Sequence, residues 1–372
     1  MSHLLIISHT DHYINENGEP CGWTSTVKEL DFLAKHFDKI THLAVLHKKS
    51  SIPKSVSSYD ANNIDFVGIP SYGGRGVMNK LRILFVLPIL FVHIFRLLIK
   101  VDMFQFRAPT SIGVFVIPYL SLFFWKKGWY KYAGNWVQKN KPVSYRIQKW
   151  MLEKMQRRPV TINGQWANQK PHCYTFENPC LNQSDLALYR EQTLDKSYQL
   201  PLEICFVGRL ESAKGVDRIV DLLKVSNVNK KIRTIHFVGD GDLREFYQKQ
   251  LNTVGVDCIF HGFLARNEVF DIYKKCQGFF LPSDSEGFPK VIAEAAAFGC
   301  VPFVSDVSSI GQYINDSNGY LWHSQKGEFE DFFMSLDLNL SILKLKKNNV
   351  YKLARKFTFE HYLNQLEKLI LE

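Results

Sequence analysis

The sequence predicts an α/β protein made of two Rossmann-like, doubly wound parallel-sheet domains that face a cleft. Short apolar runs alternate with helix-length amphipathic stretches along the whole chain, which is typical of parallel sheets covered by helices. At about 150 residues per domain, the 372 residues are enough for two separate cores. The 46% hydrophobic and 22% charged residues are those of an ordinary globular protein, so disordered and fibrous classes are excluded.

In the first half, apolar runs of strand length are followed by stretches with helical spacing, such as Val27, Leu30 and Leu33 on one face. Strands are expected at His3–His9, Ile40–His47, Ile64–Pro70, Val101–Arg107, Gly128–Ala133 and Pro159–Gly164. Helices are expected over 24–37, 78–100, 110–124 and 142–157.

The second half repeats this alternation more clearly. Strands are expected at Glu203–Val207, Thr234–Val238, Cys258–His261, Phe279–Pro282, Pro302–Ser305 and Tyr320–Trp322. Helices are expected over 215–225, 242–253, 266–276, 289–298 and 308–314. The stretch 170–200 has little apolar periodicity and is interpreted as the interdomain connection. The predicted domains are residues 1–180 and 181–350.

Positive charge is concentrated in one third of the chain. Residues 51–170 contain 18 Lys and Arg against 4 Asp and Glu, whereas residues 201–372 contain 21 against 22. Such a local field attracts anionic partners, which are nucleic acid, phosphorylated small molecules or anionic lipid. Nucleic acid is disfavoured because no recognition motif accompanies the charge.

The basic third also holds two long uncharged runs, 83–95 and 108–125. A membrane span needs roughly 20 apolar residues, so the first run is too short, and the second begins with Pro109, Thr110 and Ser111. Buried helices are the leading interpretation. A face that touches an anionic membrane surface is the second, because apolar and basic residues occur together.

Seven cysteines are scattered without a C-x-x-C pair, which disfavours a disulfide framework or a structural zinc site. The first residues lack a basic region followed by a full apolar region, so no signal peptide is expected. We therefore expect a cytoplasmic protein, peripheral at the inner face of the cell membrane.

Three strand-to-helix junctions in the second half have features of anion sites. Gly208 ends a strand, and Arg209 and Lys214 follow within a loop, where two cations can converge on one polyphosphate. Two solvated cations would give the same pattern. Gly239 and Gly241 form the second junction, where backbone can approach a ligand closely, although a plain tight turn is as good an explanation.

The third junction is the segment 283–299. Pro289 suits the start of a helix, and the amides of Gly287 and Phe288 are placed to meet a phosphate or a sugar hydroxyl. Glu286 and Glu294 are eight residues apart, and a carboxylate can accept two hydroxyl hydrogen bonds from a vicinal diol. A glutamate inside an Ala/Val/Ile helix is costly to bury without a partner, although it could simply be exposed.

Together these junctions, and above all the phrase EGFPKVIAEAAAFG behind G-R-x4-K-G, resemble retaining glycosyltransferases of family 4, which have the GT-B fold. The resemblance covers most of residues 203–322. It implies that residues 351–372 form a helix that crosses back to the first domain. It also implies a nucleotide-sugar donor, with a UDP- or GDP-sugar favoured, and no separate cofactor or metal.

The resemblance assigns roles to individual positions. Arg209 and Lys214 would hold the donor diphosphate, and fixed cations would stabilise charge on the leaving nucleotide. Glu286 would position the donor sugar and Glu294 would bind the ribose hydroxyls. The remaining nucleotide-sugar-binding candidates are Gly22, Gly208, Gly239, Gly241, His261, Gly262, Gly287, Phe288, Pro289 and Lys290.

The first half matches the family more loosely. Cys21-Gly22-Trp23 occupies the place of the family's glycine-rich loop, with Trp23 at an expected glycine. Arg107 stands where many members carry a histidine near the reacting centre. Either Arg107 is a catalytic residue that contacts a phosphate or the acceptor, or the catalytic contribution comes from elsewhere.

The leading hypothesis is a glycosyltransferase that moves a sugar to a hydroxyl of a lipid-linked or growing glycan in bacterial-type surface polysaccharide synthesis. The acceptor suggestion comes from the basic, apolar segment 51–170. The alternatives are a nucleotide-sugar epimerase of the same fold and a non-catalytic sugar-nucleotide-binding protein.

Overall fold

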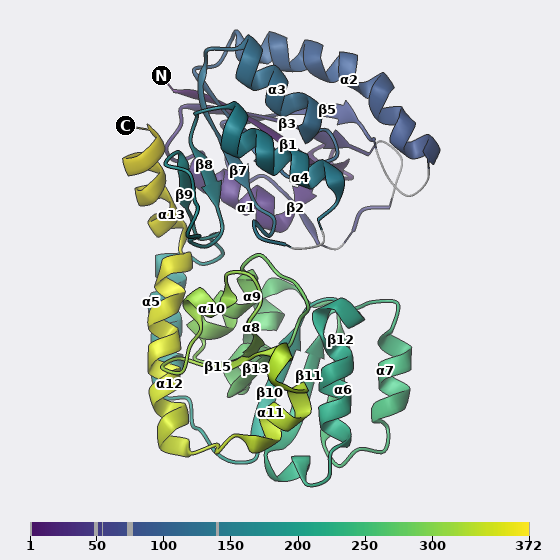
Figure 1. The fold of residues 1–372 in the computed structure, drawn as a ribbon, viewed down its shortest axis with the longest axis vertical. Helices are drawn as coiled ribbons and strands as arrows, with labels where there is room; N and C mark the ends of the chain where they lie inside the picture. Colours follow the sequence, from purple (N-terminus) through teal and green to yellow (C-terminus); the bar gives the residue numbers. More distant parts are fainter. Residues whose placement is uncertain (1, 48–50, 54, 73–76, 139–140, 372) are drawn as a thin grey trace. The chain divides into compact units, whose positions relative to one another are not determined.

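The computed structural model describes residues 2–47, 51–53, 55–72, 77–138 and 141–371. The chain forms two compact units, and the predicted fold class of two Rossmann-like α/β domains is confirmed (Figure 1). Unit 1 comprises residues 1–176 and 363–372, and unit 2 comprises residues 177–362.

Unit 1 is built on a nine-stranded sheet with β1 at its centre. Parallel pairing runs in the order β5-β3-β1-β6-β7-β8-β9, and β2 and β4 add an antiparallel extension to the end of β1. The strands are β1 (His3–Ile14), β2 (Pro20–Trp23), β3 (Lys39–Leu46), β4 (Val56–Ser58), β5 (Ile64–Pro70), β6 (Met103–Ala108), β7 (Lys127–Tyr132), β8 (Val160–Ile162) and β9 (Cys173–Thr175).

Helices cover both faces of this sheet. The outer helix layer consists of α2 (Val77–Leu98), α3 (Gly113–Phe123) and α4 (Val143–Trp150), with a π-helical turn at Met151–Met155. Phe91 of α2 stacks on Tyr119 of α3, and Gln148 of α4 donates to the carbonyl of Thr110 just before α3, so the three helices lie side by side. Helix α1 (Thr24–Leu33) lies on the other face with the C-terminal residues, because His36 after α1 bonds Glu367.

The expectation of buried helices for the two uncharged runs holds for one side of each helix. Leu90 and Ile94 of α2, and Val116 and Leu120 of α3, are fully buried on the sheet. The opposite sides carry exposed apolar side chains. No helix of the described residues is long and apolar enough to cross a bilayer.

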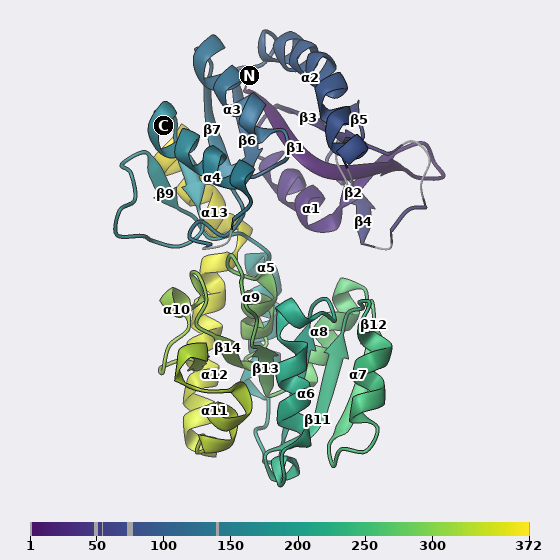
Figure 2. The same ribbon diagram turned by 45° about the vertical axis from the view of Figure 1, so that its right-hand side comes forward.

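Unit 2 has a six-stranded, all-parallel sheet in the order β12-β11-β10-β13-β14-β15. Helices α6, α7 and α11 pack on one face, and α5, α8, α9 and α12 pack on the other (Figure 2). The strands are β10 (Leu202–Val207), β11 (Ile232–Val238), β12 (Asp257–Gly262), β13 (Gly278–Leu281), β14 (Val301–Ser305) and β15 (Tyr320–Trp322). The helices are α5 (Gln183–Leu194), α6 (Val216–Lys224), α7 (Arg244–Leu251), α8 (Arg266–Lys275), α9 (Lys290–Ala297), α10 (Ile310–Tyr313), α11 (Phe329–Ser335), α12 (Leu340–Ala354) and α13 (Phe359–Leu366), of which the last reaches into unit 1.

Two expectations need correction. The stretch 170–200 is not a bare connection, because it contains β9 and α5. Among the side chains of α5 that the structure describes, the buried ones form the narrow stripe of Leu186, Tyr189 and Thr193. The helix expected over 351–372 is not continuous, because α12 ends at Ala354 and α13 begins at Phe359. Thr358 accepts a hydrogen bond from the amide of His361 and so starts a new helix.

Candidate functional site

The strand order of unit 2 defines where a ligand is expected. It is the doubly wound order in which the chain moves outward from β10 to one side and from β13 to the other. Ligands of such sheets bind outside the carboxyl ends of the strands, at this switch point. The loops 208–215 and 282–289 follow β10 and β13, so two of the three predicted junctions flank it.

Glycines hold three neighbouring strand ends in contact. The amide of Gly208 donates to Val238, and the amide of Gly239 donates to Gly262. A Cβ on Gly239 would lie 2.0 Å from the carbonyl oxygen of Gly208, and one on Gly241 would lie 2.4 Å from that of Leu210. Gly239 also has φ +122°, so a side chain is excluded both by space and by backbone conformation. The close approach leaves no room for a side chain at Gly239 or at Gly241.

Lys214 and Glu286 meet at the switch point. The Lys214 ammonium donates to Glu286 Oε1 at 2.6 Å, and the two side chains are 28% and 10% exposed. The loop that carries Lys214 ends at Gly215, with φ +78°, where a Cβ would lie 2.0 Å from the carbonyl oxygen of Pro282. The backbones after β10 and β13 are therefore locked together, which fixes the cation next to the carboxylate.

Arg209 occupies a different environment on the same loop. Its side chain is 68% exposed, and its guanidinium lies 3.4 Å from Glu211. Because this pair is largely solvated, it binds Arg209 weakly, and the guanidinium can turn toward an incoming anion at small cost.

Glu294 lies on α9 and faces Arg266 at the start of α8. The distance from its Oε1 to the Arg266 Nε is 3.7 Å, and the Glu294 side chain is 17% exposed. Burial raises the pKa of the Glu294 carboxyl, while the charges of Arg266 and Lys290 act in the opposite direction. Arg266 is itself fixed by a hydrogen bond to the carbonyl of Cys180 and by packing over the Phe270 ring.

The loop 287–290 leads into α9, as the sequence predicted. Phe288 is buried and stacks on Phe357 with ring centroids 4.4 Å apart, so this side chain anchors the loop. Ser309 donates to the carbonyl of Gly287. The backbone beside Glu286 is thus held from the side of α10.

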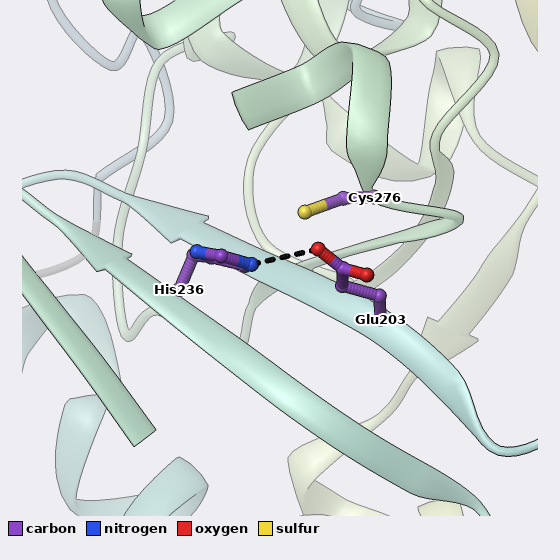
Figure 3. A group of neighbouring side chains, drawn as sticks. All are labelled: Glu203, His236 and Cys276. Atoms are coloured by element: carbon purple, nitrogen blue, oxygen red, sulfur yellow. Dashed lines mark hydrogen bonds and ion pairs between the residues drawn. The ribbon is translucent and has the colours of Figure 1, made fainter. Parts of the chain in front are cut away.

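His261 belongs to a hydrogen-bonded chain across three strands. Its Nε2 lies 2.9 Å from His236 Nδ1, and His236 Nε2 lies 2.9 Å from Glu203 Oε1 (Figure 3 shows His236 and Glu203). Burial lowers the pKa of His261, with His236 and Lys275 adding to the effect. The two rings form a hydrogen-bonded chain that ends on the Glu203 carboxylate.

Glu203, His236 and Cys276 are also the one group of potential metal ligands found among the described residues, with ligand atoms within 4.8 Å of one another. Glu203 already pairs with Arg233 at 2.7 Å as well as with His236. These contacts account for the cluster without an ion.

In unit 1, Arg107 lies near the end of β6, next to the strand at the centre of the sheet. Its guanidinium donates to Glu29 Oε1 at 2.9 Å and to Gln105 Oε1 at 2.8 Å. Lys131 of β7 bonds the same Glu29 oxygen at 2.5 Å. All three charged side chains are at least nine-tenths buried, so Arg107 is engaged inside the protein.

The predicted glycine-rich loop at 21–23 is instead strand β2, paired with the end of β1. A Cβ on Gly22 would lie 2.3 Å from His12 Nε2, so this glycine makes room for a buried imidazole. The Tyr59 hydroxyl lies 2.7 Å from both His12 Nε2 and His42 Nδ1. Burial lowers the pKa of His12 to about 4, so its ring is neutral near pH 7.

Sequence reasoning missed the partners of the candidate residues. Arg266 was not singled out, although it opens the helix after the predicted His261-Gly262 strand end. Glu29 and Lys131 had no local signal at all, because they come from α1 and β7 and meet Arg107 only through the fold.

The chain is similar to known proteins both in sequence and in fold. Residues 194–357 match the family model named Glycosyl transferases group 1. That segment contains the junctions after β10, β11 and β13 and both glutamates, so a resemblance to group 1 glycosyltransferases is supported.

Curated relatives match over part of their length. An uncharacterized glycosyltransferase of Methanocaldococcus jannaschii is 28% identical over 45% of this chain and 47% of its own. The O-antigen biosynthesis glycosyltransferase WbnH of Escherichia coli is 27% identical over 46% of this chain and 48% of its own. The alpha-galactosylglucosyldiacylglycerol synthase of Streptococcus pneumoniae is 25% identical over 42% of each chain. The matches span about half the length of these relatives.

Solved structures match the whole chain. HepE of Anabaena, in complex with UDP and glucose, aligns with TM-score 0.68 and 15% identity over 99% of both chains. Sucrose-phosphate synthase of Thermosynechococcus elongatus aligns with TM-score 0.71 and 15% identity over 99% and 98%. At this identity the likeness establishes the fold, which is GT-B.

Proposed function

We propose that the protein is a nucleotide-sugar-dependent glycosyltransferase that acts with retention of anomeric configuration. The observation that carries the proposal is the pair of Lys214 and Glu286, 2.6 Å apart at the switch point of unit 2, beside strand ends where glycines leave no room for a side chain. We call this pair and the glycine-containing strand ends beside it the cradle. A donor diphosphate would compete with Glu286 for the Lys214 ammonium and release the carboxylate toward the sugar.

The cradle suits loss of a nucleotide diphosphate. Cleavage of the anomeric C–O bond places negative charge on a phosphate, which Lys214 and Arg209 can stabilise at fixed positions. These cations supply the charge that a divalent metal would otherwise bring, so we propose metal-independent transfer. Undiminished rates in excess EDTA would agree with that, and a strict requirement for Mg²⁺ or Mn²⁺ would contradict it.

We propose a UDP-sugar as the first donor to test and a GDP-sugar as the second. HepE, a structural neighbour, was crystallised with UDP and with UDP-glucose, which supports a uridine nucleotide. The acceptor we propose is a hydroxyl of a lipid-linked or growing surface glycan. WbnH acts in O-antigen biosynthesis and the pneumococcal relative is a glycolipid synthase, which supports this class of acceptor.

The proposed compartment is the cytoplasm, at the inner face of the membrane. All seven cysteines are free thiols, and six of them are buried, which supports a reducing environment.

Nucleotide binding tests the proposal directly. Thermal unfolding is measured with UDP, GDP, ADP, CMP and dTDP on the wild type, on Glu294→Ala and on Glu245→Ala, an exposed glutamate of α7 as control. A nucleotide at about 100 times its dissociation constant adds about 2.7 kcal/mol. We expect one nucleotide to stabilise the wild type and the control but not Glu294→Ala; no response to any nucleotide would refute the donor site.

Product analysis then separates the alternatives. A transferase releases free nucleotide diphosphate and forms product only when an acceptor is present. An epimerase converts the nucleotide sugar without an acceptor, and a binding protein leaves it unchanged.

A further inference from the structure

Exposed apolar side chains gather on one part of unit 1. Of the 25 exposed large apolar side chains among the described residues, 14 lie between Leu84 and Trp150, the segment that forms the outer helix layer. Isolated exposed apolar residues are normal, but a contiguous set marks a surface that is covered in use. We name this set the apolar face; its members on α2, on the end of α3 with the turn to β7, and on α4 are Leu84, Phe85, Ile89, Val92, Phe95, Ile99, Leu122, Phe123, Trp125, Val143, Ile147 and Trp150.

Helix α2 is apolar on both sides. Its inner side is buried on the sheet through Leu90, Ile94 and Leu98. Its outer side exposes Phe85 by 79%, and Ile89 and Val92 follow at helical spacing. A surface helix of a soluble protein carries polar residues on its outer side. The apolar outer side of α2 is therefore suited to an apolar environment rather than to water.

The end of α3 continues the apolar face. Phe123 is 69% exposed, and Trp125 in the turn to β7 is 97% exposed. Phe95 of α2 lies 6.1 Å from Phe124, measured between ring centroids, so the end of α3 lies against the last turns of α2. A fully exposed tryptophan beside lysines, here Lys126 and Lys127, is typical of a side chain that enters the interface of a bilayer.

The excess of positive charge around the apolar face indicates which partner binds there. Residues 77–158 contain 15 Lys and Arg, of which Arg107 and Lys131 are buried against Glu29, but only two acidic residues, Asp102 and Glu153. Helix α4 exposes Val143, Ile147 and Trp150 at one helical spacing and carries cations between them. Apolar side chains flanked by one sign of charge match an anionic lipid surface, whereas a second copy of this chain would bring the same positive charge.

A cavity beside α4 fits a lipid headgroup. It has a volume of about 240 Å³ and is lined by two tryptophans and three cations, with Glu153 as its acidic residue; the main lining residues are Trp136, Lys141, Arg146, Lys149 and Trp150. Burial lowers the pKa of Lys141 to about 8, and neighbouring Lys149 adds to the effect. Both ammonium groups donate to the Trp136 carbonyl, and Lys149 also lies 3.6 Å from Glu153, so a phosphate would bind in competition with these contacts.

We propose that the apolar face of α2, α3 and α4 docks onto an anionic bilayer and enters its interface without crossing it. The apolar side chains would lie among the acyl chains near the headgroups, and the cations of α4 would bind the lipid phosphates. The proposed function gives this surface its purpose, a lipid-linked acceptor, but docking needs neither donor nor transfer and is measured separately.

The test is flotation of the whole protein with vesicles of phosphatidylcholine alone and with about 30% phosphatidylglycerol. The apolar variant is Phe85→Ser with Trp125→Ser, and its matched control in unit 2 is Phe246→Ser with Leu345→Ser, which are also exposed. The charge variant is Arg146→Gln with Lys149→Gln, the two cations of α4 that line the cavity, and its control is Lys224→Gln with Lys274→Gln, two exposed cations of unit 2.

We expect the wild type and both controls to bind anionic vesicles and to bind neutral vesicles far less. The apolar variant should lose about tenfold or more of its vesicle affinity, through lost apolar burial. The charge variant should lose roughly fivefold for each cation, and added salt should reproduce that loss.

Three results would overturn the proposal. They are no binding to anionic vesicles, equal binding by the apolar variant and its control, and a wild type that forms dimers which the apolar variant abolishes. Nucleotide-induced stabilisation is measured on the same preparations. If it persists while vesicle binding fails, the docking proposal alone is wrong.

Discussion

The two units differ in how far their charged side chains are exposed to solvent. In unit 2, Arg209 and Lys214 lie on loops at the strand ends and make pairs that are open to solvent on one side. In unit 1, Arg107 and Lys131 share Glu29 inside the core, below helix α1. Buried pairs that satisfy one another act as structure, whereas half-exposed cations stay available to a ligand. The comparison shows that a cation's environment, rather than its presence near a strand end, decides whether it can take part in binding.

Removing the shared carboxylate in unit 1 should have the largest effect. Glu29→Gln removes the buried carboxylate that Arg107 and Lys131 share, and removing one partner of a buried ion pair costs about 3–5 kcal/mol. Urea unfolding would measure this loss. Asp65→Asn, which breaks the exposed pair with Lys39, is the control and should cost less than about 1 kcal/mol. Equal losses in the two variants would show that the buried network is not structural.

Removing the cation of the cradle should affect activity and leave the fold intact. Lys214→Met should lower the rate of sugar transfer by about 10²–10³-fold, the usual loss for one group that stabilises developing charge. Its free energy of unfolding should fall by less than that of Glu29→Gln, since Lys214 is 28% exposed and water can reach the pair from that side. Lys224→Met on the exposed side of α6 is the control, and a variant at position 214 with normal rates would refute the assigned role.

The histidine cluster of unit 1 should make stability depend on pH. His12 is neutral in the folded protein, with a pKa of about 4 against an ordinary value of 6.5, so the unfolded chain binds more protons between these values. Stability should therefore fall by about 3 kcal/mol as the pH drops from 6.5 to 4. Denaturation at several pH values measures the slope, and His12→Gln should reduce it. An unchanged slope in that variant would assign the dependence to other groups.

The smallest expected effect is the pH dependence that Glu294 gives to nucleotide binding. Burial raises its pKa, so the carboxylate that we expect to accept ribose hydroxyl bonds becomes protonated at a higher pH than an exposed glutamate does. Nucleotide affinity should fall as the pH is lowered through this raised pKa, by roughly tenfold for each further drop of one in pH. Arg266→Gln removes a neighbouring charge that lowers the pKa of Glu294, so the fall in affinity should begin at a higher pH in that variant. Calorimetric titration between pH 4.5 and 7.5 would show it, and identical pH profiles would contradict the pairing.

Most strands and the helices between them could be predicted, because the local spacing of apolar residues indicates each of them. The exceptions have local causes as well. The stripe that α5 buries among its described side chains is too narrow to be recognised from the sequence. Strand β2 was mistaken for a loop because Gly22 suggested a glycine-rich loop, whereas this glycine makes room for the His12 ring.

Local spacing along the chain was enough to predict the strand-to-helix alternation, the two domains and the residues of the switch-point loops, since glycines, cations and glutamates there occur at fixed short intervals. Which groups face one another depended on the folded chain. Folding paired Lys214 with Glu286 and Glu294 with Arg266, and it enclosed Arg107 with Glu29 and Lys131. It also left one side of α2 exposed. The spacing of apolar residues along the sequence shows which sides of a helix are apolar. Whether a side is buried depends on which other parts of the chain pack against it.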